Sequence, residues 1–153
     1  MKLLVRFGAK LDAREKKSLR SALHLAAAGG HAGVALVLVE AKADIHAKDK
    51  FSLSALHLAA AAGGPAADAI MRVLVEAKAD IHAEDQKMWN SLDMAADKDK
   101  KGSHEACIAV LREHGAKHSL KYAASGGLAE EVAACIADGQ NLDACGEVIK
   151  FLV

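Results

Sequence analysis

Two histidines, His24 and His57, stand at the same place within identical seven-residue stretches, residues 21–27 and 54–60. Imidazoles repeated in this way could bind a metal ion. If the two stretches form neighbouring helices, these lie about 8–10 Å apart, whereas two ligands of one zinc ion each lie about 2.0–2.1 Å from the metal. The sequence therefore favours a local role for each histidine, a hydrogen bond to the serine that opens its own stretch.

The three cysteines do not form a catalytic pattern. Cys107 and Cys135 stand at apolar positions of expected helices and are interpreted as core thiols, whereas Cys145 stands in an expected loop. No histidine or acidic residue recurs with Cys145 as a nucleophile and its base require. The glycine pairs at 29–30, 63–64 and 126–127 fit turns between helices, because none follows a strand as a phosphate-binding loop does. We therefore expect no catalytic residue, no cofactor and no metal.

The composition limits the class of protein further. Of the 153 residues, 52% are hydrophobic and only 3% aromatic, so the core must consist of Ala, Leu, Val and Ile, which suit closely packed helices. The formal net charge is zero, which provides no general attraction for nucleic acid or an anionic membrane. No apolar run approaches the roughly 20 residues of a membrane helix, and three unevenly spaced cysteines fit a reducing compartment. We expect a cytoplasmic or nuclear protein.

The chain repeats itself. Residues 21–27 recur unchanged 33 positions later and in a looser form at 90–96, and residues 38–47 recur unchanged at 74–83, 36 positions later. A period in the low thirties indicates an array of stacked repeats.

These motifs resemble the ankyrin repeat family, whose unit opens with Thr-Pro-Leu-His-x-Ala and closes with Gly-Ala-Asp-Val-Asn-Ala. Ser-Ala-Leu-His-Leu-Ala-Ala stands for the opening motif here, and Lys-Ala-Asp-Ile-His-Ala stands for the closing motif. The resemblance implies an all-α solenoid of antiparallel helix pairs linked by hairpin-like loops. It also implies protein binding through those hairpins, called fingers below, and through the concave face of the first helices.

The repeats divide the chain into one domain, residues 1–144, followed by a tail at 145–153. We expect a partial repeat at 1–17 and repeats at 18–50, 51–87, 88–118 and 119–144. Turn and cap signals predict helices at 22–28, 31–40, 106–114 and 128–137. Ser21 is the expected N-cap of the first of these and Ser103 of the third. Pro65 is expected in the first turn of a further helix that ends near residue 77. Residues 97–102 are expected to form a charged turn.

Two lysines replace the glycine that the family prefers after the second helix. Lys42 and Lys78 stand at this position. If the backbone keeps the left-handed conformation there, each lysine costs about 1–2 kcal/mol.

The fingers differ from repeat to repeat and are the candidate binding site. Large apolar residues on a loop, Trp above all, are typical of recognition surfaces, although Phe51 and Trp89 could instead fold under and seal neighbouring repeats. The formal charge changes along the fingers, from net +3 in residues 10–20 to zero in 44–50 and −2 in 80–90. The candidate partner-binding residues are Lys17, Leu19, Arg20, Lys50, Phe51, Leu53, Lys87, Met88 and Trp89.

The sequence thus predicts a non-catalytic protein-protein interaction module, an adaptor or scaffold for an unidentified protein partner. The alternative is a regulatory or structural fragment of a larger multidomain enzyme or channel. We expect no nucleic acid and no membrane as partners, and we favour a monomer over self-association through the terminal units.

Overall fold

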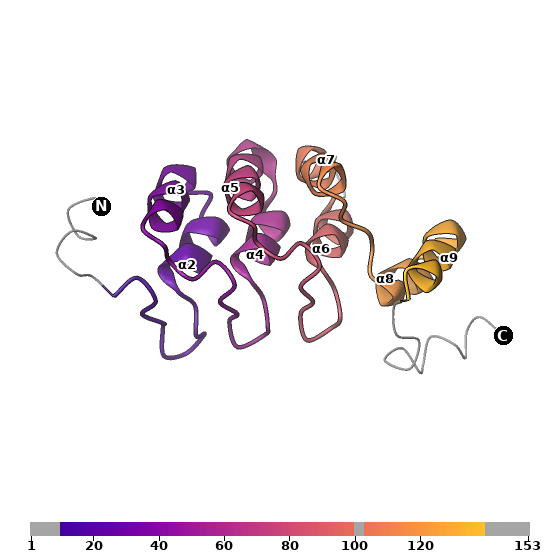
Figure 1. Ribbon diagram of the computed structural model, residues 1–153, viewed down its shortest axis with the longest axis horizontal. Coiled ribbons are helices and arrows are strands. Elements are labelled where there is room, and N and C mark those ends of the chain that lie inside the picture. Colours follow the sequence, from indigo (N-terminus) through magenta and orange to yellow (C-terminus); the bar gives the residue numbers. More distant parts are fainter. Residues whose placement is uncertain (1–9, 100–102, 140–153) are drawn as a thin grey trace.

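The computed structural model describes residues 10–99 and 103–139, and in these the chain is all-α, as predicted. Eight helices form four pairs, each pair joined by a short turn (Figure 1). The only β-type pairing in the described residues is an isolated antiparallel bridge between Arg14 and Ser21. The helices are α2 (Ala22–Ala28), α3 (Ala32–Glu40), α4 (Ala55–Ala62), α5 (Gly64–Glu76), α6 (Ser91–Lys98), α7 (Glu105–Glu113), α8 (Leu120–Ser125) and α9 (Ala129–Ala137).

The first three pairs form two layers. Helices α2, α4 and α6 lie side by side in one layer, α3, α5 and α7 lie in the other, and the hairpins project from the edge next to the first layer (Figure 1). This is the solenoid that the repeats predict.

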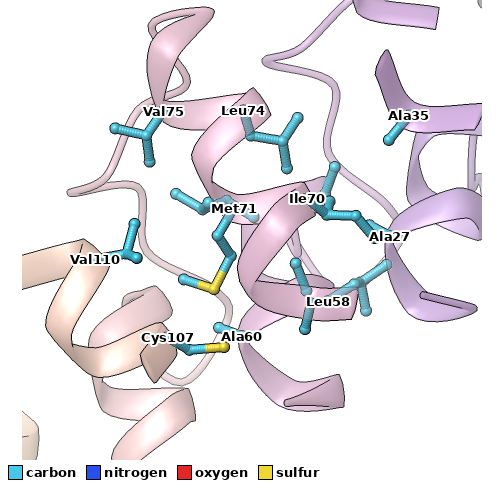
Figure 2. Packing of buried hydrophobic residues seen from close by; sticks show 14 of the residues in the cluster. Ala27, Ala35, Leu58, Ala60, Ile70, Met71, Leu74, Val75, Cys107 and Val110 are labelled. Atoms are coloured by element: carbon cyan, nitrogen blue, oxygen red, sulfur yellow. The ribbon is translucent and has the colours of Figure 1, made fainter. Parts of the chain in front are cut away.

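Small side chains allow the helices to approach closely. Ala27, Ala59 and Ala60 are fully buried between the layers. The longer side chains of α5 fill the centre: Ile70 is directed toward Ala27, whereas Met71 is directed toward the next pair (Figure 2). Helix α5 therefore holds both of its neighbours in a single core.

Local cap signals decide where the first helices begin. Ser21, Ser54 and Asn90 have extended backbone immediately before α2, α4 and α6. The Asn90 side chain accepts a hydrogen bond from the Asp93 backbone at 3.0 Å, which satisfies one of the free N–H groups of the helix start. The predicted helix at residues 22–28 and its cap Ser21 are confirmed.

The second helices end in Schellman motifs. After α3, the Ala43 N–H donates to the Leu38 carbonyl and the Lys42 N–H to the Val39 carbonyl, both at 3.0 Å, and Lys42 has φ +65°. Lys78 follows α5 in the same way with φ +69°. Both lysines thus have the left-handed backbone on which the expected cost depends. After α7 the family's glycine is retained, and Gly115 has φ +86°.

The predicted cap Ser103 is wrong. Helix α7 begins after His104, and the Ser103 hydroxyl lies 2.9 Å from His104 Nδ1 instead. The reason is a contact with the second repeat, because the Gly64 N–H donates to the Ser103 carbonyl and the His104 ring packs on Gly63. The charged turn expected at residues 97–102 begins later than expected, because residues 97 and 98 still belong to helix α6.

The fourth pair is set apart from the other three (Figure 1). Its buried residues, Leu120, Ala123, Val132 and Cys135, form a second apolar cluster. A cavity of about 370 Å³ separates the third and fourth pairs. In the described residues no hairpin projects between α7 and α8 (Figure 1). Cys145, the tail and most of the partial first repeat lie outside the described residues.

Candidate partner-binding surface

The second and third fingers are each attached to the repeat before them by a buried histidine. His24 Nδ1 accepts hydrogen bonds from the Ser21 hydroxyl at 2.8 Å and from the Ser21 backbone N–H at 3.3 Å. Its Nε2–H donates to the Leu53 carbonyl at 3.0 Å, at the end of the next finger. The predicted serine bond is confirmed, whereas the bond to the next repeat was not predicted.

His57 repeats this arrangement one unit later. Its Nδ1 lies 2.8 Å from the Ser54 hydroxyl, and its Nε2–H donates to the Trp89 carbonyl at 3.1 Å. Burial lowers the pKa of both His24 and His57 below the usual value of 6.5, although the carbonyl that accepts from each ring opposes the shift. A neutral ring is required, because Nδ1 must accept while Nε2 donates.

The third repeat reverses the polarity of this connection. Asp93 occupies the motif position of His24 and His57. Its carboxylate accepts a hydrogen bond from the Asn90 N–H at 3.0 Å, just as each histidine accepts one from the serine that opens its motif. A carboxylate cannot donate to a carbonyl of the next repeat. The segment just before α8 instead supplies donors, the His118 Nδ1–H at 2.7 Å and the Ser119 N–H at 3.1 Å. His118 occupies the position that Leu53 and Trp89 occupy in the earlier repeats.

An aspartate shapes each of the second and third fingers. Asp49 Oδ1 accepts from the backbone N–H groups of Phe51 at 2.9 Å and Leu53 at 3.0 Å. Asp85 accepts from those of Lys87 at 2.7 Å and Trp89 at 3.0 Å. Sequence reasoning missed both aspartates, although each stands five residues before an opening motif, a repeated spacing that could have revealed them.

The tips of all three fingers contain a residue in the left-handed region. Leu19, Ser52 and Met88 have φ values of +57°, +61° and +63°, and they follow one another at the repeat spacings of 33 and 36. Side chains other than glycine rarely adopt this conformation, which costs about 1–2 kcal/mol per residue. The same strained turn is thus built three times, so its shape is a property of the array.

Neighbouring fingers are joined through their backbones. The Lys50 N–H donates to the Ser18 carbonyl at 3.0 Å, and the Gln86 N–H donates to the Phe51 carbonyl at 3.2 Å. Gln86 also donates from its side chain to the Lys50 carbonyl at 2.7 Å. The fingers therefore form one continuous, mutually supported row.

The nine predicted site residues lie on this row and divide into two groups by exposure. Leu19 and Phe51 are 45% and 48% exposed, as are Leu25 and Ile136 to a similar extent on helices. The exposed group is Lys17, Leu19, Lys50, Phe51 and Lys87. The half-buried group is Arg20, Leu53, Met88 and Trp89.

Each half-buried residue has a structural contact. Arg20 pairs with Asp49 of the next finger at 3.2 Å. Leu53 packs on the main core and Met88 on the second cluster. The Trp89 ring meets the Tyr122 ring edge-on, with 5.5 Å between centroids. The alternative in which an aromatic residue seals neighbouring repeats thus describes Trp89, whereas Phe51 is exposed.

The two cysteines of the described residues lie in the core. Cys107 and Cys135 are buried, as predicted for core thiols, and burial raises the pKa of Cys107 to about 11. Within residues 10–99 and 103–139, no three His, Cys, Asp or Glu side chains are placed to bind one metal ion. None of the helices in this part of the chain is long and apolar enough to cross a membrane.

Comparison with known families agrees with the repeat pattern. Residues 3–59 match the family model described as ankyrin repeats (many copies). The comparison with curated proteins finds no match.

Proposed function

The chain belongs to the ankyrin repeat family, and we therefore propose that it is a non-catalytic module that binds another protein, as an adaptor or scaffold. Ankyrin repeats are in general protein-protein interaction modules. For this chain we propose the finger row, with the concave face of α2, α4 and α6 beside it, as the binding surface. The exposed group named above, which includes Leu19 and Phe51, would make the principal contacts.

The observation that supports this proposal is the exposure of large apolar side chains on a fixed backbone. Leu19 and Phe51 project from turns that hydrogen bonds hold between neighbouring fingers. Binding to such a surface loses little conformational entropy, because the surface is ordered before the partner arrives. Aromatic side chains such as Phe51 are enriched at protein-protein interfaces.

We further propose that the protein acts in the cytoplasm or nucleus and as a monomer. The thiols of Cys107 and Cys135 are free, which fits a reducing compartment. Light scattering at increasing protein concentration tests the monomer, and a mass that rises toward twice that of the chain refutes it.

The binding surface can be tested by site-specific photocrosslinking in cell extract. A photoreactive phenylalanine analogue at position 51 should form discrete protein adducts. The matched control carries the same analogue in place of Leu36, which is 44% exposed on α3, in the layer farther from the hairpins (Figure 1). Adducts of equal number and yield at both positions, or none at position 51, would refute the proposed surface.

A further inference from the structure

The fourth helix pair covers part of the third finger. Met88 packs on the second apolar cluster, and the Trp89 ring meets the Tyr122 ring of α8 edge-on, with 5.5 Å between centroids. Leu19 occupies the position of Met88 in the first finger and is 45% exposed, whereas Met88 is half-buried. The third finger therefore carries an apolar tip like that of the first, but the fourth pair hides part of it.

The joint between the third and fourth pairs is packed less well than the earlier joints. Neighbouring pairs among the first three touch in both layers, whereas α8 and α9 contact each other far more than they contact α6 or α7. A cavity of about 370 Å³ lies at the joint, although packed protein interiors contain few voids larger than a water molecule. In the described residues the fourth pair also has a separate core of its own.

Hydrogen bonds hold the fourth pair at its beginning. The buried Asp93 carboxylate accepts from His118 Nδ1–H at 2.7 Å and from the Ser119 N–H at 3.1 Å. The Asn90 side chain donates to the Lys117 carbonyl at 2.7 Å. All of these contacts end on the three residues directly before α8, so the fourth pair is attached to the third repeat chiefly at one end.

Farther from this attachment the joint contains a partly exposed ion pair. Arg112 Nη2 lies 3.8 Å from Glu131 Oε1, and the Arg112 side chain is largely in solvent. Such surface pairs contribute little to stability. Local opening is least costly where few buried apolar contacts are lost, and the fourth pair meets this condition better than any earlier pair does.

We propose that the fourth helix pair is a detachable cover of the third finger. It separates from the third repeat beyond its attachment at residues 117–119, and the partner protein then binds Met88 and Trp89 together with the exposed Phe51 of the neighbouring finger. Apolar side chains of the partner replace the contacts that Met88 and Trp89 lose. This inference rests on the proposed function, since it extends the same binding surface.

Trp89 is the only tryptophan of the chain, so its fluorescence reports on the joint. The opening variant is Ala123→Asp, which places a carboxylate at a fully buried position of the second cluster. The matched control is Ala133→Asp, which makes the same change at an exposed position of α9. Because the main core is separate from the second cluster, the first three pairs should stay folded in both variants.

Native-state hydrogen exchange tests whether the cover detaches in the wild type. Relative to their intrinsic rates, the amides of α8 and α9 should exchange at least about tenfold faster than those of α4 and α5. In Ala123→Asp the Trp89 emission should shift to longer wavelength and acrylamide should quench it more strongly, whereas Ala133→Asp should behave as the wild type does. The amides of α4 and α5 should remain protected in both variants.

Photocrosslinking from position 51 in cell extract then tests the competition with the partner. The opening variant should give a higher yield of protein adducts than Ala133→Asp, because the partner no longer has to displace the fourth pair. The two variants carry the same added charge, so a general effect of an aspartate would appear in both.

Three results would overturn the detachable cover: equal protection of the amides in α8–α9 and α4–α5, unchanged Trp89 emission in Ala123→Asp, or loss of protection in α4 and α5 of that variant. If position 51 gives adducts but their yield in Ala123→Asp is equal to or below that of the control, only this inference fails. If position 51 gives no adducts in any of the proteins, the proposed function fails with it.

Discussion

Replacing Lys42 by glycine should stabilise the protein. Lys42 occupies the C′ position of a Schellman motif with φ +65°. Its side chain is exposed and makes no hydrogen bond or ion pair to any described residue. The substitution therefore removes strain and no contact, and the backbone bonds of the motif remain.

The magnitude follows from two opposing contributions. A side chain in the left-handed region costs about 1–2 kcal/mol, whereas glycine adds about 0.4–1 kcal/mol of conformational entropy to the unfolded chain. The net gain is about 0.5–1 kcal/mol for Lys42→Gly. The same change at Lys78, in a separate repeat, should add to it. The double variant should gain about 1–2 kcal/mol and melt about 3–6 °C higher.

Urea denaturation followed by circular dichroism measures this gain, and the chain offers two controls. Lys42→Ala removes the charge but keeps a side chain at positive φ, so it should change stability by less than about 0.5 kcal/mol. Gly115→Lys places a side chain at the same motif position of the third repeat, where no neighbour lies within 4 Å of the new Cβ, and should lose what Lys42→Gly gains. Stabilisation by Lys42→Ala as large as by Lys42→Gly would show that charge, not strain, is responsible.

Three further perturbations follow from the contacts described above. Folding lowers the pKa values of His24 and His57, so just below pH 6.5 the unfolded chain binds more protons than the folded chain. The stability that the two neutral histidines contribute should therefore be complete above about pH 6.5 and be lost as the pH falls. The free energy of unfolding should decrease by at most about 1.4 kcal/mol per pH unit for each histidine. A urea midpoint that stays constant from about pH 7 to about pH 5.5 would contradict this. Gly63→Ala should destabilise the protein by about 2 kcal/mol or more, because the new Cβ would lie 2.4 Å from His104 Nε2 and the residue has a positive φ. Adding His104→Ala to this variant should recover part of the lost stability in thermal melts. Cys107 is fully buried and its thiol pKa is raised to about 11, so it should resist alkylation near pH 8 until denaturant is added. Mass spectrometry of the alkylated peptide measures this. Rapid labelling in the native protein would show instead that the core opens at Cys107.

The helices could be predicted because their signals are local. The residues that start and stop α2, Ser21 and the glycines after residue 28, lie within one turn of the helix they bound. Ser103 gave the same kind of signal and failed, because the first turn of α7 responds to the Gly63 loop, about 40 residues earlier in the chain. Contacts between repeats of that kind leave no mark in a short sequence window.

The position of the candidate site could be predicted, but the exposure of its residues could not. Trp89 takes the half-buried finger position of Leu53, directly before the opening motif, and there meets the Tyr122 ring, whereas Phe51 takes the exposed position of Lys87. The ion pair between the first two fingers was also hidden, since the sequence shows that Asp49 is acidic but not that Arg20 pairs with it.

The reversed connection at Asp93 determines how such an array could grow. The joints after the first and second whole repeats are alike, each a histidine that donates to a backbone carbonyl, so a duplicated unit inserted between them finds the partner it needs. The joint after the third repeat is different, because Asp93 requires the donors His118 and Ser119. A copy of the second repeat placed there would set the Asp93 carboxylate against the copied Leu53 carbonyl, and neither group can donate a hydrogen bond. The order of the units is thereby encoded in single hydrogen bonds, and the array can lengthen on one side of Asp93 but not on the other.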